Sequence, residues 1–419
     1  MTVLIYWFRN DLRLNDNPAL MEACLQADYL VPVYIHPPQA QLTHAPGFPR
    51  ESRHRQTFLR ESLDDLKGQL RGLGSDLLEY AGEPADVLVQ LTQITGADAI
   101  YCEQIEAPEE IHQCQQIQDL GIELKEFWQS SMLGLENLPF PVQDMPDMFT
   151  QFRKEIERAG LKFAAPLLAP LQIPPLPEFS EVLPRVIDGE VAPSAAIFAG
   201  GEMSALAHLK QYLERRLPDS YKETRNQLIG KDYSSKFSPG LALGCISART
   251  IAAELAEYEA CYGANDGTYW LWFELLWRDY FRFLHFKYGN QLYRARGLSK
   301  APIEYSDPQQ FERWRTGNTG ERLIDAGMRE LLNTGYLSNR MRQIVASYWI
   351  YDLRGDWRLG AAWFESQLID YDVYSNQGNW LYIAGRGTDP RGGRPFNVAK
   401  QTQDHDAQGA YRKLWLVTN

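Results

Sequence analysis

The sequence contains no apolar run long enough to cross a membrane. Its longest candidate, 270–286, is interrupted by Glu274, Arg278, Asp279 and Arg282, whereas a membrane-spanning helix needs about 18 or more successive apolar residues. The chain opens directly on an apolar strand, with neither a basic start nor a small-residue cleavage site, so we expect no secretory signal. These absences predict a cytoplasmic protein that has no membrane partner.

Cysteine is scarce and shows no pattern. The five cysteines form no C-x-x-C pair or other metal-ligand spacing, and their odd number argues against a disulfide framework. We therefore expect reduced, mostly buried thiols and no metal site. The residues are Cys24, Cys102, Cys114, Cys245 and Cys261.

Two further absences concern nucleotides and nucleic acids. No G-x-G-x-x-G follows the first apolar strand, so the usual dinucleotide site is missing. The net charge of −12 opposes nonspecific DNA binding, although net charge says little about local patches. From Arg278 to Lys300 there are six basic residues against the single acid Asp279, which predicts either a local basic surface or a solvated basic helix.

Short apolar runs alternate with helix-length segments in the first third of the chain. This pattern predicts an α/β, Rossmann-like domain with a parallel five-stranded sheet covered on both faces. Pro18 and Pro84 stand where helices would begin, because proline is favoured in the first helical turn. The predicted strands are 3–8, 30–35, 77–81, 98–102 and 122–127.

The rest of the chain divides into a proline-rich stretch and a helical half. A chain of 419 residues exceeds what one hydrophobic core usually supports, so we expect an α/β domain over 1–128 and an all-α domain over 204–419. Proline interrupts helices and sheets, so 129–203 is predicted to be an interdomain connector with a short helix over 149–159. The other predicted helices are 204–216, 248–260, 267–288, 321–333, 338–353 and 358–369.

Two helix faces in the all-α half could carry chemistry. One face of the helix 267–288 combines a carboxylate and a guanidinium with large rings, which indicates either a site or an ion pair on a core helix. Its residues are Trp270, Glu274, Trp277, Arg278 and Phe281. A second face, either a polar site or a solvated surface, combines Asn339, Arg342, Gln343 and Ala346.

Two loops add polar groups. Asp370, Asp372 and Asn376 lie within seven residues and could bind a metal, cap a helix or accept hydrogen bonds from a ring edge. Because the segment lacks the further ligands and the glycine of a calcium loop, we do not expect a metal there. Residues 234–238 form a hydroxyl-rich loop with one cation, which is either a phosphate cradle or only a turn.

These groups belong to blocks of sequence that closely resemble the photolyase/cryptochrome family. Within the family, FTQFRK at 149–154, Gln343 and Tyr382 are similar to the cryptochrome DASH branch. The missing C-terminal cysteines argue against the iron–sulfur branch, which needs four ligands. The blocks are WFRNDLRLNDNPAL at 7–20, YKETRNQLIGKDYSSKFSPGLALGCIS at 221–247, YWLWFELLWRDYFRF at 269–283, LSNRMRQ at 337–343 and SQLIDYDVYSNQGNW at 366–380.

The resemblance implies that the helical half binds FAD. In relatives Arg342 and Asp370 form an ion pair over the flavin, and Asn376 faces flavin N5, where an amide can turn its donor or its acceptor toward the ring. By the same match, Arg278 lies near the phosphate and ribityl region. That region would contact Tyr221, Ser234, Ser235, Lys236, Phe237 and Ser238, and the isoalloxazine and adenine would be surrounded by Asn339, Arg342, Asp370 and Asp372.

The reaction that the resemblance implies is the splitting of a cyclobutane pyrimidine dimer in DNA. Light-excited, reduced flavin lends an electron to a dimer that has left the base stack, and then recovers it. Glu274 would bind the base edges between Trp277 and Tyr382, while Arg225 and Arg340 would hold the flanking phosphates. The protein is expected to be a monomer.

The same resemblance predicts a preference for single-stranded or locally unpaired DNA. Gln343 and Tyr382 stand where other photolyases usually carry Met and Trp. The pocket would therefore be less apolar and would compensate less of the free energy needed to flip a dimer out of a duplex.

Several positions depart from the family pattern. Trp380 and Trp357 match the first two tryptophans of the photoreduction path, but by register with Trp314 the third falls on Glu304, next to Tyr305, which could serve instead. Gly240 and Gln377 stand where the DASH pattern normally has aromatic residues, which loosens the pocket or creates space for another group. Relatives commonly bind a methenyltetrahydrofolate antenna between the two domains, but Leu133 and Gly134 replace the usual Tyr and His.

Two other functions stay open at this point. A photoreceptor would use the same flavin site to signal and would bind DNA without repairing it. Glu274 in an open pocket favours repair, and a long disordered tail, which would favour signalling, is not seen after the last block. A dark electron-transfer flavoprotein is disfavoured by the missing dinucleotide fingerprint.

Overall fold

The computed structural model describes residues 1–161, 163–179, 198–302 and 305–416. Its amino-terminal part is a parallel sheet of five strands in the order β5-β2-β1-β6-β7. The predicted α/β, Rossmann-like arrangement is confirmed, and each predicted strand lies within two residues of its observed bounds. The strands are β1 (Val3–Phe8), β2 (Tyr29–His36), β5 (Leu78–Ala81), β6 (Ala99–Glu103) and β7 (Leu124–Phe127). A separate hairpin consists of β3 (Thr43–His44) and β4 (Phe48–Pro49).

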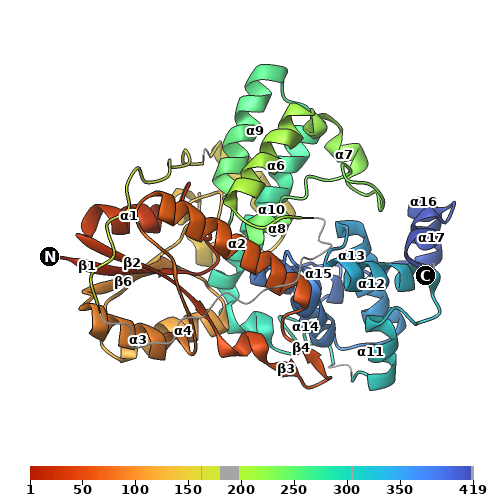
Figure 1. Cartoon of the computed structure of the whole chain (residues 1–419). Helices are drawn as coiled ribbons and strands as arrows, with labels where there is room; N and C mark the ends of the chain where they lie inside the picture. The colour runs from red at the N-terminus through yellow and green to blue at the C-terminus, as the bar shows by residue number, and fades with distance from the viewer. Residues whose placement is uncertain (162, 180–197, 303–304, 417–419) are drawn as a thin grey trace.

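Helices cover both faces of this sheet, as Figure 1 shows. Alternate residues of β1 point to opposite faces: Tyr6 belongs to the apolar cluster beneath α1 and α2, and Trp7 to the cluster beneath α3 and α4. Two of these helices begin at Pro18 and Pro84, as predicted. The four are α1 (Pro18–Gln26), α2 (Arg53–Gly72), α3 (Pro84–Thr95) and α4 (Pro108–Asp119).

The segment 129–203, predicted to be a connector, contributes to the core of the helical part. Its helix α5 (Phe149–Ala159) covers the predicted range and buries its apolar face among the carboxyl-terminal helices. The backbone N–H groups of Met132 and Leu133 each donate to the Asp279 carboxylate at 2.9 Å. Domain limits after residues 128 and 203 stay a prediction.

The carboxyl-terminal part of the described chain is helical and lies beside the sheet part, to its right and above it in Figure 1. Its helices are α6 (Glu202–Glu214), α7 (Tyr221–Thr224), α8 (Ser238–Ala242), α9 (Ala248–Tyr262), α10 (Asp266–Tyr288), α11 (Pro308–Arg315), α12 (Arg322–Thr334), α13 (Asn339–Ser347), α14 (Trp357–Gln367), α15 (Val373–Ala384), α16 (Val398–Asp406) and α17 (Ala410–Leu416).

The expectations about these helices were wrong in two respects. The helix predicted over 338–353 ends as an α-helix at Ser347 and continues as a π-helical turn, Tyr348–Asp352. Helices α7, α8, α11, α15, α16 and α17 were not predicted. In α15, Ser375, Asn376 and Asn379 are residue types that favour caps and turns over helix interiors. Asp372 starts it as an N-cap by accepting from the Ser375 backbone N–H at 2.7 Å.

Two glycines let the central helices approach closely. A Cβ atom at Gly378 of α15 would lie 2.1 Å from the Phe281 ring of α10, and one at Gly360 of α14 would lie 2.2 Å from the Trp380 ring. Any side chain at either position would push α15 away from its neighbours. The close contact fixes α10, α14 and α15 as the frame of the site described below.

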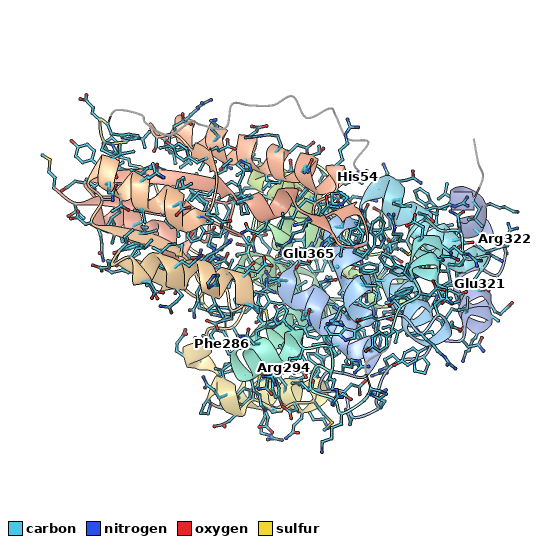
Figure 2. The ribbon with its side chains drawn as sticks, turned by 90° about the horizontal axis from the view of Figure 1, so that it is seen from below. His54, Phe286, Arg294, Glu321, Arg322 and Glu365 are labelled. Carbon is cyan, nitrogen blue, oxygen red and sulfur yellow. The ribbon has the colours of Figure 1, made fainter. Side chains whose placement is uncertain are left out.

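Polar contacts join the sheet part to the helical part, at the junction where Figure 2 labels Glu365 of α14 and His54 of α2. Arg50 Nε lies 2.8 Å from Glu365 Oε1, and a His54 ring nitrogen lies 3.0 Å from the Leu332 carbonyl oxygen. Within the described ranges, no helix has the length and apolar character needed to span a bilayer.

Candidate active site

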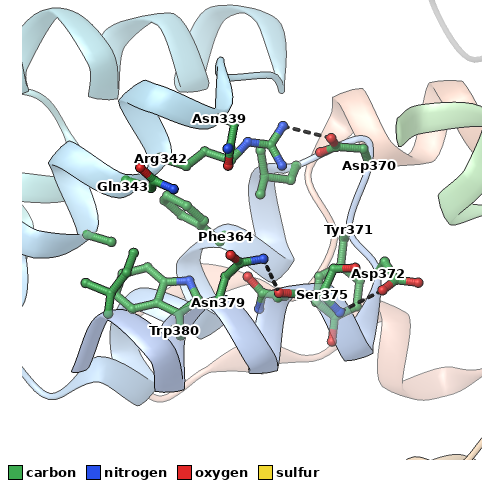
Figure 3. A pocket seen from close by; sticks show the side chains of 14 residues that line it. Asn339, Arg342, Gln343, Phe364, Asp370, Tyr371, Asp372, Ser375, Asn379 and Trp380 are labelled. Carbon is green, nitrogen blue, oxygen red and sulfur yellow. Dashed lines mark hydrogen bonds and ion pairs between the residues drawn. The ribbon is translucent and has the colours of Figure 1, made fainter. Parts of the chain in front are cut away.

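A cavity between α13, α14 and α15, here called the inner pocket, collects most of the predicted flavin-ring residues (Figure 3). All five residues predicted to surround the flavin ring, adenine or N5 line it: Asn339, Arg342, Asp370, Asp372 and Asn376. Its other lining residues are Gln343, Ala346, Phe364, Leu368, Tyr371, Ser375, Asn379, Trp380 and Ile383.

One wall of the inner pocket is the predicted ion pair. Arg342 Nη2 lies 2.8 Å from Asp370 Oδ2, as the dashed line in Figure 3 shows, and the Asp370 side chain is only 1% exposed. Burial by itself would lower the pKa of Arg342, but the attraction of Asp370 outweighs burial and raises that pKa. Arg342 therefore keeps a fixed positive charge beside the pocket.

Acceptor atoms in this pocket fit a flavin. Asp370 Oδ1 is buried and accepts no hydrogen bond from any described residue, a state that costs about 1–3 kcal/mol unless a donor arrives. Asn376 donates from Nδ2 to the Ala361 carbonyl at 3.1 Å, which leaves its Oδ1 as a second acceptor. Acceptors beside a fixed guanidinium suit a ligand with N–H and O–H donors on or near an electron-rich ring, as FAD has.

A second ion pair lies behind the first. Arg282 Nη2 lies 2.6 Å from Asp372 Oδ2, and Asp372 also caps α15. Burial would raise the pKa of Asp372, but Arg282 and Arg278 outweigh burial and hold the pKa well below its usual range. Sequence reasoning missed Arg282, although its position four residues after Arg278 on one helix was a usable signal.

A larger cavity of about 360 Å³, here called the outer cleft, opens beside the inner pocket between α7, α10, α13 and α15. The structure brings together here all six residues predicted to contact DNA: Arg225, Glu274, Trp277, Arg340, Gln343 and Tyr382. Arg278 also lines this cleft, together with seven residues that sequence reasoning missed: Asn226, Phe273, Ser375, Asn379, Ile383, Arg394 and Phe396.

Two rings in edge-to-face contact form one corner of the outer cleft. The Trp277 and Tyr382 ring centroids lie 5.7 Å apart at an interplanar angle of 79°. Phe149 of α5 stacks on Trp277 at 3.7 Å and fixes that ring from behind. Arg394 lies over Tyr382 at 4.6 Å, donates to its hydroxyl and is held by Asp389 at 2.8 Å. The cleft thus presents a rigid aromatic corner of the kind that stacks on flat bases.

Glu274 is the one carboxylate that lines the outer cleft within the described chain, and it is paired with Arg225. Burial raises the pKa of Glu274, and Arg225 opposes that shift. The Arg278 guanidinium is held by the carbonyl oxygens of Ser130 and Leu241. Burial, reinforced by nearby Arg282, lowers the pKa of Arg278 to about 10, so this side chain stays charged at neutral pH.

The two cavities share a wall. Five residues line both of them: Asn339, Gln343, Ser375, Asn379 and Ile383. A group bound in the inner pocket is therefore separated from a group in the outer cleft by no more than these side chains. Such an arrangement suits transfer between a bound cofactor and a bound substrate.

The predicted phosphate loop lies elsewhere. Ser234 and Ser238 lie beside Tyr336, whose ring lies 5.1 Å from the Arg342 guanidinium. Lys236 has a left-handed backbone at φ 54° and donates to the Gly230 carbonyl at 3.0 Å, and burial lowers its pKa to about 8. None of the six predicted phosphate and ribityl contacts lines the inner pocket or the outer cleft; those residues are Tyr221, Ser234, Ser235, Lys236, Phe237 and Ser238.

Tryptophans surround the inner pocket on its buried side. Trp380 lines the pocket and packs against Trp314, with ring centroids 6.4 Å apart, and Trp314 lies 5.2 Å from Trp349. Trp357 is buried and donates to the Ala295 carbonyl at 3.0 Å. Of the two positions predicted for the third tryptophan, Glu304 lies outside the described residues and Tyr305 is 92% exposed.

Other positions that depart from the family pattern can be located in the structure. Leu133 is buried in the helical core, and its backbone is held by Asp279. Burial raises the pKa of that aspartate to about 6 although Leu133 and Met132 donate to it. Gln377 donates to the Leu292 carbonyl at 2.7 Å, and Gly240 borders a cavity of about 140 Å³ beside Lys236. A further cavity of about 180 Å³ lies between the sheet and the helical part.

One cluster of metal-ligand types was not visible in the sequence spacing. Cys102, Cys114 and Glu126, from β6, α4 and β7, bring their ligand atoms within 4.8 Å of one another. Arg9 Nη1 lies 3.4 Å from Cys114 Sγ, so a cation there would meet a guanidinium at close range. We interpret the cluster as two core thiols beside a surface carboxylate.

Comparison with known proteins agrees with the two-part structure. A family model described as DNA photolyase matches residues 4–176, and one described as the FAD binding domain of DNA photolyase matches residues 270–418. A cryptochrome DASH from Gloeobacter violaceus is 44% identical, over 99% of this chain and 85% of that protein. The described chain is thus a photolyase-type flavoprotein by fold and site.

Solved structures give the same relationship. A Synechocystis sp. cryptochrome superimposes with a TM-score of 0.94 at 44% identity, covering 99% of this chain and 88% of that one. An archaeal photolyase from Sulfolobus tokodaii, described with two FAD molecules, gives 0.80 at 28% identity, covering 99% and 90%. The chain belongs to the photolyase/cryptochrome family and is similar to its cryptochrome DASH branch, as the sequence predicted.

Proposed function

We propose that this protein binds DNA and, in blue light, splits cyclobutane pyrimidine dimers, preferentially in single-stranded DNA. The observation that carries the proposal is the shared wall between a pocket that fits a flavin and a cleft that fits a flipped pair of bases. An enzyme of this kind is a deoxyribodipyrimidine photo-lyase, a carbon–carbon lyase.

The inner pocket would hold FAD through residues already described. When bound, reduced FAD excited by blue light supplies an electron to the dimer and recovers it after the ring opens. Arg342 keeps a positive charge beside the ring, Asp370 Oδ1 accepts from the ligand, and Asn376 presents an acceptor from α15.

The outer cleft would hold the dimer. Trp277 and Tyr382 offer flat faces for the two bases, and the Glu274 carboxyl can bind the polar base edges. Gln343 and the Tyr382 hydroxyl make the cleft more polar than one built from Met and Trp. A polar cleft compensates less of the unstacking free energy, which favours lesions that are already unpaired.

The cavity between the sheet and the helical part is the place we propose for an antenna chromophore, with methenyltetrahydrofolate as the first candidate. Its walls combine the rings of Trp7 and Tyr34 with the charged groups of Arg50, Arg55 and Glu109, which suits a flat polar ring with a charged tail. The archaeal relative with two FAD molecules shows that a second chromophore occurs in this family.

Photorepair of a defined substrate tests the proposal. Reduced protein and a dimer-containing oligothymidine are illuminated with blue light, and recovery of thymine absorbance is recorded. We expect recovery in wild-type protein and in Glu223→Ala, whose side chain is exposed on α7, and none in Glu274→Ala that retains FAD. Recovery in Glu274→Ala at the wild-type rate would contradict the assignment of the cleft.

A photoreceptor that binds DNA without repairing it is the alternative. It would use the same flavin pocket and basic cleft, and the relatives from Gloeobacter and Synechocystis both carry the name cryptochrome. Tight binding of the dimer oligonucleotide with no recovery of thymine absorbance in wild-type protein would favour this alternative over repair.

A further inference from the structure

Glu274 is not free to read a base edge in the unbound protein. Arg225 Nη1 donates to Glu274 Oε1, and the Arg225 guanidinium also lies over the Trp270 ring at 4.1 Å. One guanidinium is therefore held by a carboxylate from α10 and by a ring one turn earlier on the same helix. Arg225, which is expected to bind a backbone phosphate, is thus paired with Glu274, which is expected to bind the bases.

The chemistry of the paired carboxyl differs from that of a free one. The Glu274 side chain is 33% exposed, and burial raises the pKa of its carboxyl above the ordinary value while Arg225 counteracts the rise. While it is paired with Arg225, the Glu274 carboxyl accepts a hydrogen bond from the guanidinium and directs that oxygen away from a ligand. A pyrimidine edge offers both N–H donors and carbonyl acceptors, so a carboxyl released from Arg225 can match it better.

The rest of the cleft is prepared to receive an anion. Arg340 donates to Asn226 Oδ1 at 3.0 Å, but its Nε is buried and has no partner among the described residues. Burial and the like charge of Arg225 lower the pKa of Arg340. Four arginines line the outer cleft against the single carboxylate of Glu274, and they are Arg225, Arg278, Arg340 and Arg394. A phosphate entering here relieves repulsion as well as gaining hydrogen bonds.

We propose that Arg225 is a positioning residue that masks Glu274, and that a DNA phosphate beside the lesion takes Arg225 in exchange for Glu274. The carboxyl then turns to the flipped bases only when the sugar–phosphate backbone is engaged. This inference rests on the proposed repair function and deepens it. Backbone recognition and base recognition become one coupled event, because one guanidinium cannot pair fully with both anions at once.

Removing the charge of a single phosphate tests the exchange. Each of the two linkages that flank the dimer in an oligothymidine is replaced in turn by an uncharged methylphosphonate. Affinity is measured by fluorescence anisotropy, and repair yield is measured at saturating substrate by recovery of thymine absorbance. The proteins are wild type, Arg225→Gln, Arg225→Lys and Arg340→Gln, and FAD content is recorded for each.

At one of the two linkages, the methylphosphonate should lower the wild-type yield at saturation about tenfold, the effect of losing one charge-assisted hydrogen bond in the reactive complex. Arg225→Gln should bind the oligonucleotide more weakly than wild type. Its repair yields on the phosphodiester and on that methylphosphonate substrate should be nearly equal, because Glu274 is already released. Arg225→Lys should restore the sensitivity of the yield. In Arg340→Gln, which leaves the Arg225–Glu274 pair intact, the yield should stay sensitive to that linkage.

Two results would overturn the exchange while leaving the proposed function standing. One is an equal wild-type yield at saturation on phosphodiester and both methylphosphonate substrates, which would limit Arg225 to adding affinity. The other is a yield in Arg225→Gln as low as that of Glu274→Ala. Wild-type protein that binds the oligonucleotide and repairs none of it would instead overturn the proposed function, and the exchange with it.

Discussion

The inner pocket and the outer cleft share a wall but differ in how their charged side chains are paired. In the inner pocket each carboxylate has its own guanidinium, Arg342 for Asp370 and Arg282 for Asp372. Four arginines line the outer cleft: Arg225 pairs with Glu274 and Arg394 with Asp389, whereas Arg278 and Arg340 have no acidic partner within hydrogen-bond distance among the described residues. Paired charges suit a ligand that stays, and surplus cations suit a polyanion that binds and leaves. This difference in charge pairing is what we expect if the inner pocket is the proposed cofactor site and the outer cleft the proposed substrate site, made largely by the same helices.

The largest effect should come from breaking an inner pair. Asp370→Asn removes the partner of the partly buried Arg342, so we expect loss of FAD and of all photochemistry, with a drop in unfolding free energy of about 2 kcal/mol. The ratio of flavin to protein absorbance and a denaturant titration measure both. Asp404→Asn, on an exposed position of α16, is the matched control. Full FAD content in Asp370→Asn would show that the inner pair does not hold the cofactor.

A change on the buried side of the inner pocket should separate photoreduction from binding. Trp380 lines the pocket and packs on Trp314, so we expect Trp380→Phe to reduce flavin photoreduction to background while FAD content and DNA affinity stay unchanged. Tyr305→Phe should only slow it. Flavin absorbance under blue light with an external reductant measures the rate. Normal photoreduction in both variants would refute a path through these residues.

DNA binding in the outer cleft should depend on salt concentration, whereas FAD binding in the inner pocket should not. Arg340→Gln should weaken single-stranded DNA binding and reduce the slope of log K against log salt by about 0.7, the value for one phosphate contact. FAD content should be unchanged, because Arg340 does not line the inner pocket. Arg313→Gln, exposed on α11, is the control. An unchanged slope in Arg340→Gln would remove this arginine from the DNA contacts.

The smallest effect should be a change in DNA affinity as the pH falls. Because burial raises the pKa of Glu274, this carboxyl takes up a proton at a higher pH than an ordinary glutamate and then releases Arg225. Tyr221 and Arg340 are the other ionisable neighbours. Binding of lesion-free single-stranded DNA should then tighten by about threefold or more. Anisotropy titrations against pH measure it. The same pH slope in Glu274→Gln would assign the effect to another group.

The inner pocket should keep FAD over the pH range in which DNA binding tightens. The pKa of Asp372 lies far below its usual range, so the stability that this group contributes is fully present above the ordinary carboxyl pKa of about 3.9. It is lost only as pH falls below that value and through the depressed folded pKa. FAD release that tracks the tightening of DNA binding would contradict this separation.

Local patterns in the sequence were enough for much of the fold. Apolar alternation located the five strands, and Pro18 and Pro84 marked helix starts, because these signals depend on neighbouring residues. Helix α15 escaped because its polar first half is stabilised by a cap and by close packing at Gly378, which are tertiary effects. The break of the predicted helix at Ser347 had no local signal of this kind.

Prediction of the candidate site from the sequence was limited in the same way, because long-range contacts leave no local pattern. Spacing on α10 and family resemblance named the six residues, predicted to contact DNA, that the structure gathers in the outer cleft. Arg394 was missed because it reaches Tyr382 from a segment without regular structure. The pairing of Arg225 with Glu274 joins residues 49 positions apart, so no periodicity could reveal it. The cluster of Cys102, Cys114 and Glu126 was hidden for the same reason.

The most direct test of the account compares two forms of one substrate. A thymine dimer is placed in an oligonucleotide, either single-stranded or annealed to its complement, and wild-type protein with reduced FAD is illuminated with blue light. Recovery of thymine absorbance gives the repair rate for each form. The account predicts repair of the single strand and much weaker repair of the duplex. Equal rates on both forms, or no recovery on either, would contradict it.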